Sequence, residues 1–111
     1  MRTKTLWIKE EYLGLILSGK KDVEVRVGYP NISRLRAGDV LLLNGLHSFE
    51  ITRVDHYEGH EALLECEDAD RIAPGMSIEG LLVALRDIYP PDKEALGVVA
   101  LELRPLTNDE A

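Results

Sequence analysis

Apolar and polar residues alternate with different periods along the chain, and each change of period predicts a change of secondary structure. β-forming residues predict a short strand at 3–8. Apolar residues at helical spacing predict a helix at 10–18 that begins with acidic residues and ends at Gly19. From 22 to 27 the period is two, since three valines alternate with charged residues. This segment therefore predicts a strand with one face for the core and one charged face.

The rest of the chain reads as short elements separated by turn-forming residues. The segments 28–31 and 36–39 contain Gly, Pro, Asn and Asp residues and predict turns. Further strands are expected at 40–43, from 49 to about 55 or 56, and at 97–103, and further helices at 60–65 and after the N-cap residue Ser77 as far as Pro90. Strands outnumber helices, and few connections resemble βαβ crossovers. The pattern therefore predicts an α+β fold with a small, largely antiparallel, barrel-like sheet.

Length and composition indicate that these predicted elements form a single domain. The chain has 111 residues, which predicts one domain at 1–106 followed by a polar C-terminal tail at 107–111. Its one cysteine, Cys66, cannot close an internal disulfide. No segment has the pattern of a signal peptide or the length of a membrane span. We therefore expect a soluble cytoplasmic protein, with a monomer as the favoured state.

Charge is distributed unevenly around a net value of −7. Residues 1–36 contain eight basic and four acidic side chains, whereas the rest of the chain is strongly acidic. This balance disfavours duplex DNA as a ligand, because proteins that coat a duplex neutralise many phosphates with lysine and arginine. An anionic ligand is expected to bind in the N-terminal third.

The charged residues between the predicted helix and the next strand form the main candidate site. Lys20 and Lys21 follow Gly19 directly. Glu24 and Arg26 share one face of the strand, about 7 Å apart. Arginine and lysine suit a phosphate or a base edge, and glutamate accepts hydrogen bonds from an exocyclic amino group. Alternatively, the lysines cap the carbonyl end of the helix and Glu24 pairs with Arg26.

This pattern resembles the ASCH-domain family across nearly the whole chain. The residues that carry the resemblance are Leu6, Ile8, Tyr12, Ile16, Gly19, Lys21, Glu24, Arg26, Gly38-Asp39-Val40, Ile88-Tyr89-Pro90 and Gly97-Val98-Val99-Ala100. Membership of the family implies a PUA-like fold, which is a small, mostly antiparallel β-barrel with flanking helices. It also implies a cleft, lined by Lys21, Glu24 and Arg26, that takes RNA or a modified nucleoside.

The resemblance leaves catalysis open. Some ASCH proteins remove the acetyl group from N4-acetylcytidine with a lysine, a threonine and a glutamate, and others have been described as ribonucleases. Lys21 matches the lysine, but Glu24 occupies the threonine position and Pro74 lies near the glutamate position. Because a carboxylate can act as a base or a nucleophile, Lys21 and Glu24 are the candidate catalytic residues.

Histidine and aromatic residues add smaller signals. His56 and His60 lie four residues apart, but Gly59 disfavours a helix between them and no third ligand is evident. We therefore expect surface histidines and no metal site. Trp7 and Tyr89 are candidate platforms for stacking on a base, with packing in the core or at a rim as the alternative.

The sequence thus predicts a domain that binds RNA or a nucleotide-like ligand without a cofactor, through Lys20, Lys21, Glu24, Arg26 and Tyr89. One alternative is a hydrolase of modified pyrimidine nucleosides, or a ribonuclease, that uses the same cleft. A second alternative is a regulatory domain whose acidic surface binds a protein partner.

Overall fold

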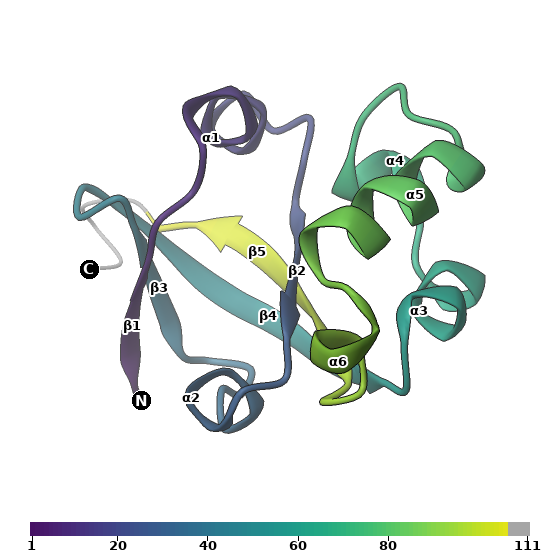
Figure 1. Ribbon diagram of the computed structural model, residues 1–111. Helices are drawn as coiled ribbons and strands as arrows, with labels where there is room; N and C mark the ends of the chain where they lie inside the picture. The colour runs from purple at the N-terminus through teal and green to yellow at the C-terminus, as the bar shows by residue number, and fades with distance from the viewer. Residues whose placement is uncertain (107–111) are drawn as a thin grey trace.

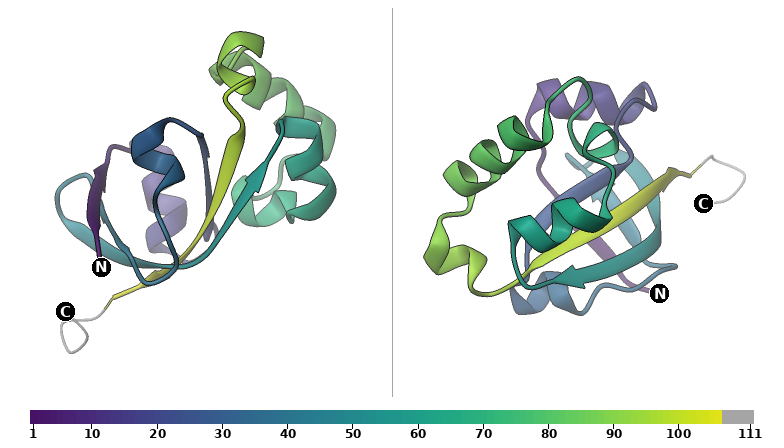
Figure 2. Two further views of the ribbon diagram at one scale, coloured as in Figure 1. Left: turned by 90° about the horizontal axis from the view of Figure 1, so that it is seen from below. Right: turned by 90° about the vertical axis from the view of Figure 1, so that its right-hand side faces the viewer.

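A curled sheet forms the centre of the molecule, and helices lie at its open ends and along one outer side (Figure 1, Figure 2). The computed structural model describes residues 1–106, and the predicted tail at 107–111 lies outside them. Within 1–106, the strands are β1 (Thr3–Leu6), β2 (Val23–Val27), β3 (Val40–Leu43), β4 (His47–Tyr57) and β5 (Val98–Pro105). The helices in the same part of the chain are α1 (Glu10–Leu17), α2 (Pro30–Ser33), α3 (His60–Cys66), α4 (Ala69–Ile72), α5 (Ile78–Ile88) and α6 (Pro91–Glu94).

The strands of the described residues form a five-stranded sheet in the order β1-β3-β4-β5-β2. β1 runs parallel to β3, and the other neighbouring strands are antiparallel. The long strand β4 pairs with both β3 and β5, and its register with β5 shifts between Ile51 and Arg53. Such a shift bends a strand and increases its twist. The sheet is therefore curled, and its edge strands β1 and β2 face each other across an opening (Figure 2).

This sheet is a half-barrel. No strand pairing joins β1 to β2 within 1–106, and the chain passes from one to the other through α1. α1 and α2 cover the two ends of the opening (Figure 1). The α+β prediction is confirmed, and the architecture is consistent with a PUA-like fold, but the predicted small β-barrel is only a half-barrel, because the sheet does not close. β1 has four residues and pairs with β3 along one edge, while its other edge forms no ladder with β2 in the described part of the chain.

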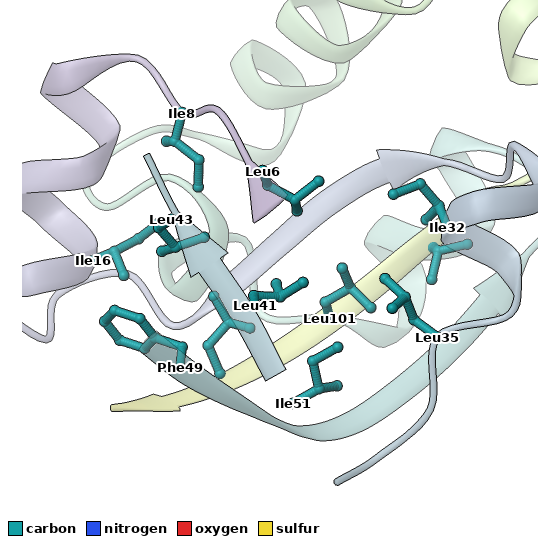
Figure 3. Packing of buried hydrophobic residues seen from close by; sticks show 12 residues of the cluster. Leu6, Ile8, Ile16, Ile32, Leu35, Leu41, Leu43, Phe49, Ile51 and Leu101 are labelled. Atoms are coloured by element: carbon teal, nitrogen blue, oxygen red, sulfur yellow. The ribbon is translucent and has the colours of Figure 1, made fainter. Parts of the chain in front are cut away.

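Two apolar cores lie on opposite faces of the sheet. The first core fills the concave side of the half-barrel (Figure 3), and it contains Leu6, Ile8, Ile16, Ile32, Leu35, Leu41, Leu43, Phe49, Ile51, Val99, Leu101 and Leu103. The second core joins β2 and β5 to the helices α3, α4 and α5. Alternate residues of β5 belong to different cores, as expected for a strand that is covered on both faces.

β2 is also covered on both faces, and this positions its charged residues. All three of its valines are buried, as the alternation predicted, and the first two pack in the second core. Glu24 and Arg26 lie opposite Leu101 and Val99, which belong to the first core. Because cross-strand partners point to the same side of a sheet, Glu24 and Arg26 point to the concave side, at the open edge of the half-barrel.

Several local signals are confirmed. Gly19 ends α1 with a positive φ of 81°, and the Ser77 hydroxyl accepts a hydrogen bond from the N–H of Gly80 at 3.0 Å, which caps α5. The short helices α2, α4 and α6 were not predicted. α2 takes up the end of the expected turn at 28–31, because Pro30 suits the first position of a helix. Among residues 1–106, no helix combines the length and apolar character needed to cross a bilayer.

Candidate functional site

A cleft of about 260 Å³ opens between β2, the segment that joins β1 to α1, and helix α5. Its β2 side is charged and is formed by Lys21, Glu24 and Arg26. Its opposite side is apolar and is formed mainly by α5. The prediction that these three charged residues share one concavity is therefore confirmed.

The end of α1 directs two neighbouring lysines to opposite environments. The N–H groups of Lys20 and Lys21 both donate to the carbonyl oxygen of Leu15, at 3.0 and 3.1 Å, and this closes the last turn of the helix. Lys21 then enters the protein and is only 4% exposed, whereas Lys20 is exposed. Lys20 does not line the cleft.

The ammonium group of Lys21 makes three short contacts inside the protein. Its Nζ lies 2.6 Å from the carbonyl oxygen of Val23, 2.8 Å from that of Ile72 and 3.1 Å from Oε1 of Glu24. An ammonium has three protons to donate, so the three acceptors use all of them. Lys21 thus ties the end of α4 to β2 and holds Glu24 in place.

The Glu24 carboxylate lies between two cations. Its Oε1 contacts Lys21, and its Oε2 accepts hydrogen bonds from Nε and Nη2 of Arg26, at 3.0 and 2.8 Å. The side chain is 10% exposed, so this pairing takes place largely out of water. The pairing of Glu24 with Arg26, which the sequence left as an alternative to a site, is therefore present within the cleft itself.

Arg26 connects the two edges of the half-barrel. Its Nη2 also donates to the carbonyl oxygen of Trp7, at 3.2 Å, which joins β2 to the segment after β1. Its Nη1 has no hydrogen-bond partner among residues 1–106. Because the other nitrogens fix the guanidinium plane, Nη1 presents donors of fixed direction to the cleft.

Tyr89 closes the cleft beyond the end of α5. Burial raises the pKa of its hydroxyl, the positive charge of Arg26 opposes this rise, and the negative charge of Glu24 adds to it. The hydroxyl is therefore protonated at neutral pH and makes no hydrogen bond within the described residues, so it is a donor for a ligand. The backbone of Tyr89 is fixed by a contact with α3, since Nε2 of His60 lies 3.0 Å from the carbonyl oxygen of Tyr89.

The position of His60 differs from the one predicted from the sequence. A surface position was expected, but the side chain is completely buried at the start of α3. The reason is tertiary: the ring packs against the end of α5, where its Nε2 lies 3.0 Å from the carbonyl oxygen of Tyr89 and its plane stacks on the Tyr89 ring, and Glu94 accepts a hydrogen bond from the backbone N–H of His60 at 2.9 Å. Within residues 1–106, no group of three or more His, Cys, Asp or Glu side chains is arranged to hold a metal ion.

The apolar wall of the cleft was not recognised from the sequence. It consists of Tyr12 from α1 and of Leu81, Leu85 and Ile88 from α5. The spacing of the α5 residues marks one face of a helix, which is equally typical of a face buried in a core. Only the position of α5 next to the open edge of the half-barrel shows that part of this face lines a cleft.

A second charged cluster supports the site from the far side of β2. Nε of Arg71 in α4 donates to Asp22 at 2.7 Å, and its Nη2 donates to Glu102 of β5 at 2.9 Å. Arg53 of β4 donates through two nitrogens to the buried carboxylate of Glu67, each at 2.8 Å. These contacts hold α4 against the sheet, which keeps the Ile72 carbonyl within reach of Lys21.

This second cluster predicts a loss of stability in acid. The hydrogen bonds from Arg53 lower the pKa of Glu67, against the opposing effect of burial, and the Tyr57 hydroxyl lowers it further. A carboxyl whose pKa is lowered by folding stabilises the protein above its unfolded pKa of about 4.3, and this stabilisation is lost as the pH falls through the folded pKa. We expect the free energy of unfolding, measured by urea denaturation, to stay nearly constant between pH 7 and 5. At pH values below about 4.5 it should decrease.

The matched variants for this prediction are Glu67→Gln and Glu65→Gln, since Glu65 is an exposed neighbour on α3. Glu67→Gln is expected to cost about 1.5–3 kcal/mol at pH 7, as for a hydrogen bond to a charged group, and less at pH 3. Glu65→Gln is expected to leave the acid dependence unchanged. Parallel pH curves for the wild-type protein and Glu67→Gln would contradict the assignment.

Known proteins share this pattern and this architecture. The family model for the ASCH domain matches residues 6–107. The crystal structure of the hypothetical protein PH0355 is similar with a TM-score of 0.87 and 29% sequence identity, covering 96% of this chain and 100% of that one. The solution NMR structure of protein PF0455 from Pyrococcus furiosus is similar with a TM-score of 0.77 and 31% identity, covering 94% and 97% of the two chains. No curated protein matches this chain.

Proposed function

The chain belongs to the ASCH domain family, and on that premise we propose that its cleft binds RNA or a nucleotide-like ligand by admitting one unstacked base. The side chains that meet the ligand in this proposal are Glu24, Arg26 and Tyr89. Lys21 acts indirectly, because its protons are already donated inside the protein. Lys20 lies outside the cleft and contributes positive charge near it.

The observation that carries the proposal is that the cleft combines an apolar wall with a polar edge fixed by internal hydrogen bonds. Aromatic and aliphatic side chains from α1 and α5 form the apolar wall of the cleft, and such surfaces suit the flat faces of a base. At the polar edge, Glu24 offers the acceptor site that remains on Oε1, and Arg26 and Tyr89 offer donors, which matches the mixed donor and acceptor edge of a base. The internal hydrogen bonds of Glu24 and Arg26 hold these groups in place before binding, which reduces the ordering cost.

The size of the cleft supports a single base over a duplex. Its volume of about 260 Å³ lies just below the range of about 300–1,000 Å³ found for small-molecule sites. A double helix presents paired and stacked bases, which such a cleft cannot admit. The net charge of −7 also opposes any extended contact with a polyanion.

The test is a titration with a six-nucleotide single-stranded RNA of mixed sequence and with the corresponding duplex, over a range of salt concentrations. We expect the single strand to bind more tightly. With about two to four phosphate contacts, the plot of log affinity against log salt should have a slope of roughly −1.5 to −3, since each contact on a single strand contributes about −0.7. Equal affinity for the duplex, or a slope typical of duplex-coating proteins, would contradict the proposal, as would an absence of binding.

A second prediction concerns hydrolysis. We expect no release of cytidine from N4-acetylcytidine, because the protons of Lys21 are committed to three internal acceptors and Glu24 and Pro74 stand where the resemblance implies a threonine and a glutamate. Chromatography after incubation at high protein concentration is the measurement. Turnover that disappears in Glu24→Ala would show that the cleft is catalytic and that Glu24 replaces the threonine functionally.

A further inference from the structure

Trp7 stands exposed at the mouth of the cleft. It lies between the end of β1 and the start of α1, and 72% of its surface is open to solvent although it lines the cleft. Its two neighbours, Leu6 and Ile8, are both buried in the first core. Packing of Trp7 in the core, one of the alternatives considered from the sequence, is therefore wrong, and Trp7 lies at the rim of the cleft. Single exposed apolar residues are common on protein surfaces, but Trp7 lines the same cleft as the exposed Met76 and Ile88, and apolar residues gathered at one site indicate a contact surface.

The backbone around Trp7 is fixed by hydrogen bonds on both sides. Asn44, in the turn after β3, donates its N–H to the carbonyl oxygen of Leu6 at 2.9 Å. The side chain of Asn44 accepts from the N–H of Ile8 at 2.7 Å and donates to the carbonyl oxygen of Ile8 at 2.8 Å. The carbonyl oxygen of Trp7 itself accepts from Arg26 at 3.2 Å. With this backbone fixed, the indole has only two side-chain torsions left to order on binding, which keeps its entropic cost low.

The surroundings of Trp7 combine apolar surface with positive charge. Met76 and Ile88 are also exposed at the rim of the same cleft. Lys9, two residues after Trp7, lines the cleft and is exposed. The adjacent Arg26 carries a second positive charge, although Glu24 offsets it. This combination of an aromatic face and nearby cations is typical of surfaces that bind single-stranded nucleic acid.

We propose that Trp7 forms a second base subsite, in which its indole stacks on the base next to the one held in the cleft. The inference rests on the proposed function and makes it more specific, since the ligand is then a single-stranded RNA segment of at least two nucleotides and not a free nucleotide. Lys9 is the cation placed to meet the phosphate that joins the two bases. Because every base has a flat π face, this subsite tolerates any base and adds affinity without adding sequence specificity.

The test compares three kinds of probe by isothermal titration calorimetry. They are the four nucleoside 5′-monophosphates, the homotrinucleotide of the monophosphate that binds most tightly, and the same trinucleotide with abasic sugars on both sides of one remaining base. The abasic probe keeps the phosphates but removes the flanking bases. Stacking of one base on an aromatic residue corresponds to about a 5- to 150-fold gain in affinity. We expect the trinucleotide to exceed the abasic probe by a factor in this range.

Fluorescence assigns the gain to Trp7, because it is the only tryptophan of the chain. We expect the trinucleotide to quench this fluorescence and the abasic probe to leave it nearly unchanged. In Trp7→Ala the trinucleotide and the abasic probe should bind equally, whereas Trp7→Phe should keep most of the difference. Val83→Ala is the matched control, since Val83 is an exposed apolar residue of α5 that does not line the cleft.

Two results would overturn the inference while leaving the proposed function intact. One is equal binding of the trinucleotide and the abasic probe to the wild-type protein. The other is a trinucleotide advantage that persists in Trp7→Ala, which would place the flanking base elsewhere and leave Trp7 for a protein contact. If none of the monophosphates, the trinucleotide or the six-nucleotide RNA binds, the proposed function itself fails.

Discussion

Replacing Lys21 by methionine is expected to lower the free energy of unfolding by about 3–5 kcal/mol, the range for breaking a buried ion pair by removing one partner. The change leaves the buried Glu24 carboxylate with Arg26 as its remaining cation. It also removes the donor for two carbonyl oxygens, those of Val23 and Ile72. The methionine keeps most of the apolar stem, so the loss reports on the ammonium group. Guanidinium chloride denaturation followed by circular dichroism is the measurement.

The adjacent lysine supplies the control for this experiment. Lys20→Met removes the same charge one residue earlier, at an exposed position. Its effect is expected to stay within about 0.5 kcal/mol, as for most surface substitutions. Adding Glu24→Gln to Lys21→Met should recover part of the stability, because the carboxylate that lost its partner is then neutral. Similar losses for Lys20→Met and Lys21→Met would show that net charge, and not burial, determines the effect.

Replacing Arg26 by alanine is expected to weaken RNA binding by about 10- to 150-fold, which corresponds to a hydrogen bond to a charged group of about 1.5–3 kcal/mol. Arg26 is the cleft residue whose Nη1 is open to a ligand, and its other nitrogens set the orientation of Glu24. Arg26→Lys keeps the charge but loses the planar fork, and we expect it to recover only a minor part of the affinity. The measurement is a titration with the six-nucleotide RNA at one salt concentration.

Arg2→Ala is the matched control for Arg26→Ala. Arg2 precedes β1, is exposed and does not line the cleft, so its removal tests the effect of losing one positive charge. We expect a loss of less than about threefold, since one phosphate contact on a single strand contributes little at moderate salt. Circular dichroism at the temperature of the titration verifies that each variant is folded. Equal losses for the two variants would mean that diffuse electrostatic attraction causes the binding.

The local pattern of residues was sufficient for most of the secondary structure. The alternation in β2, the glycine at the end of α1 and the serine at the start of α5 are all read from neighbours within a few positions. These signals work because backbone conformation and the direction of side chains on one element depend on adjacent residues. The same reasoning identified the segment that contributes the charged wall of the cleft. It also gave the right core face for β2.

Burial of the charged residues could not be read from the same pattern. Lys20 and Lys21 are identical in type and adjacent in sequence, yet Lys20 is exposed and Lys21 is buried, with only 4% of its surface accessible. The difference arises from the Ile72 carbonyl, which lies 51 positions away in the chain and accepts a hydrogen bond from Lys21. His60 is buried for a similar reason, because its ring packs against Tyr89, 29 positions later in the chain. Contacts of this kind depend on how elements pack.

The shape of the site depends on the same long-range packing. The face of α5 that lines the cleft has the spacing of an ordinary core face, and Trp7 has the sequence context of a strand end. Their roles follow from the sheet, which curls at the β4 register shift and leaves β1 and β2 unpaired with each other in the described residues. Whether a side chain meets a neighbour, a ligand or water is a property of the space between elements. Periodicity along the chain does not contain that information, since it records only which residues share a face.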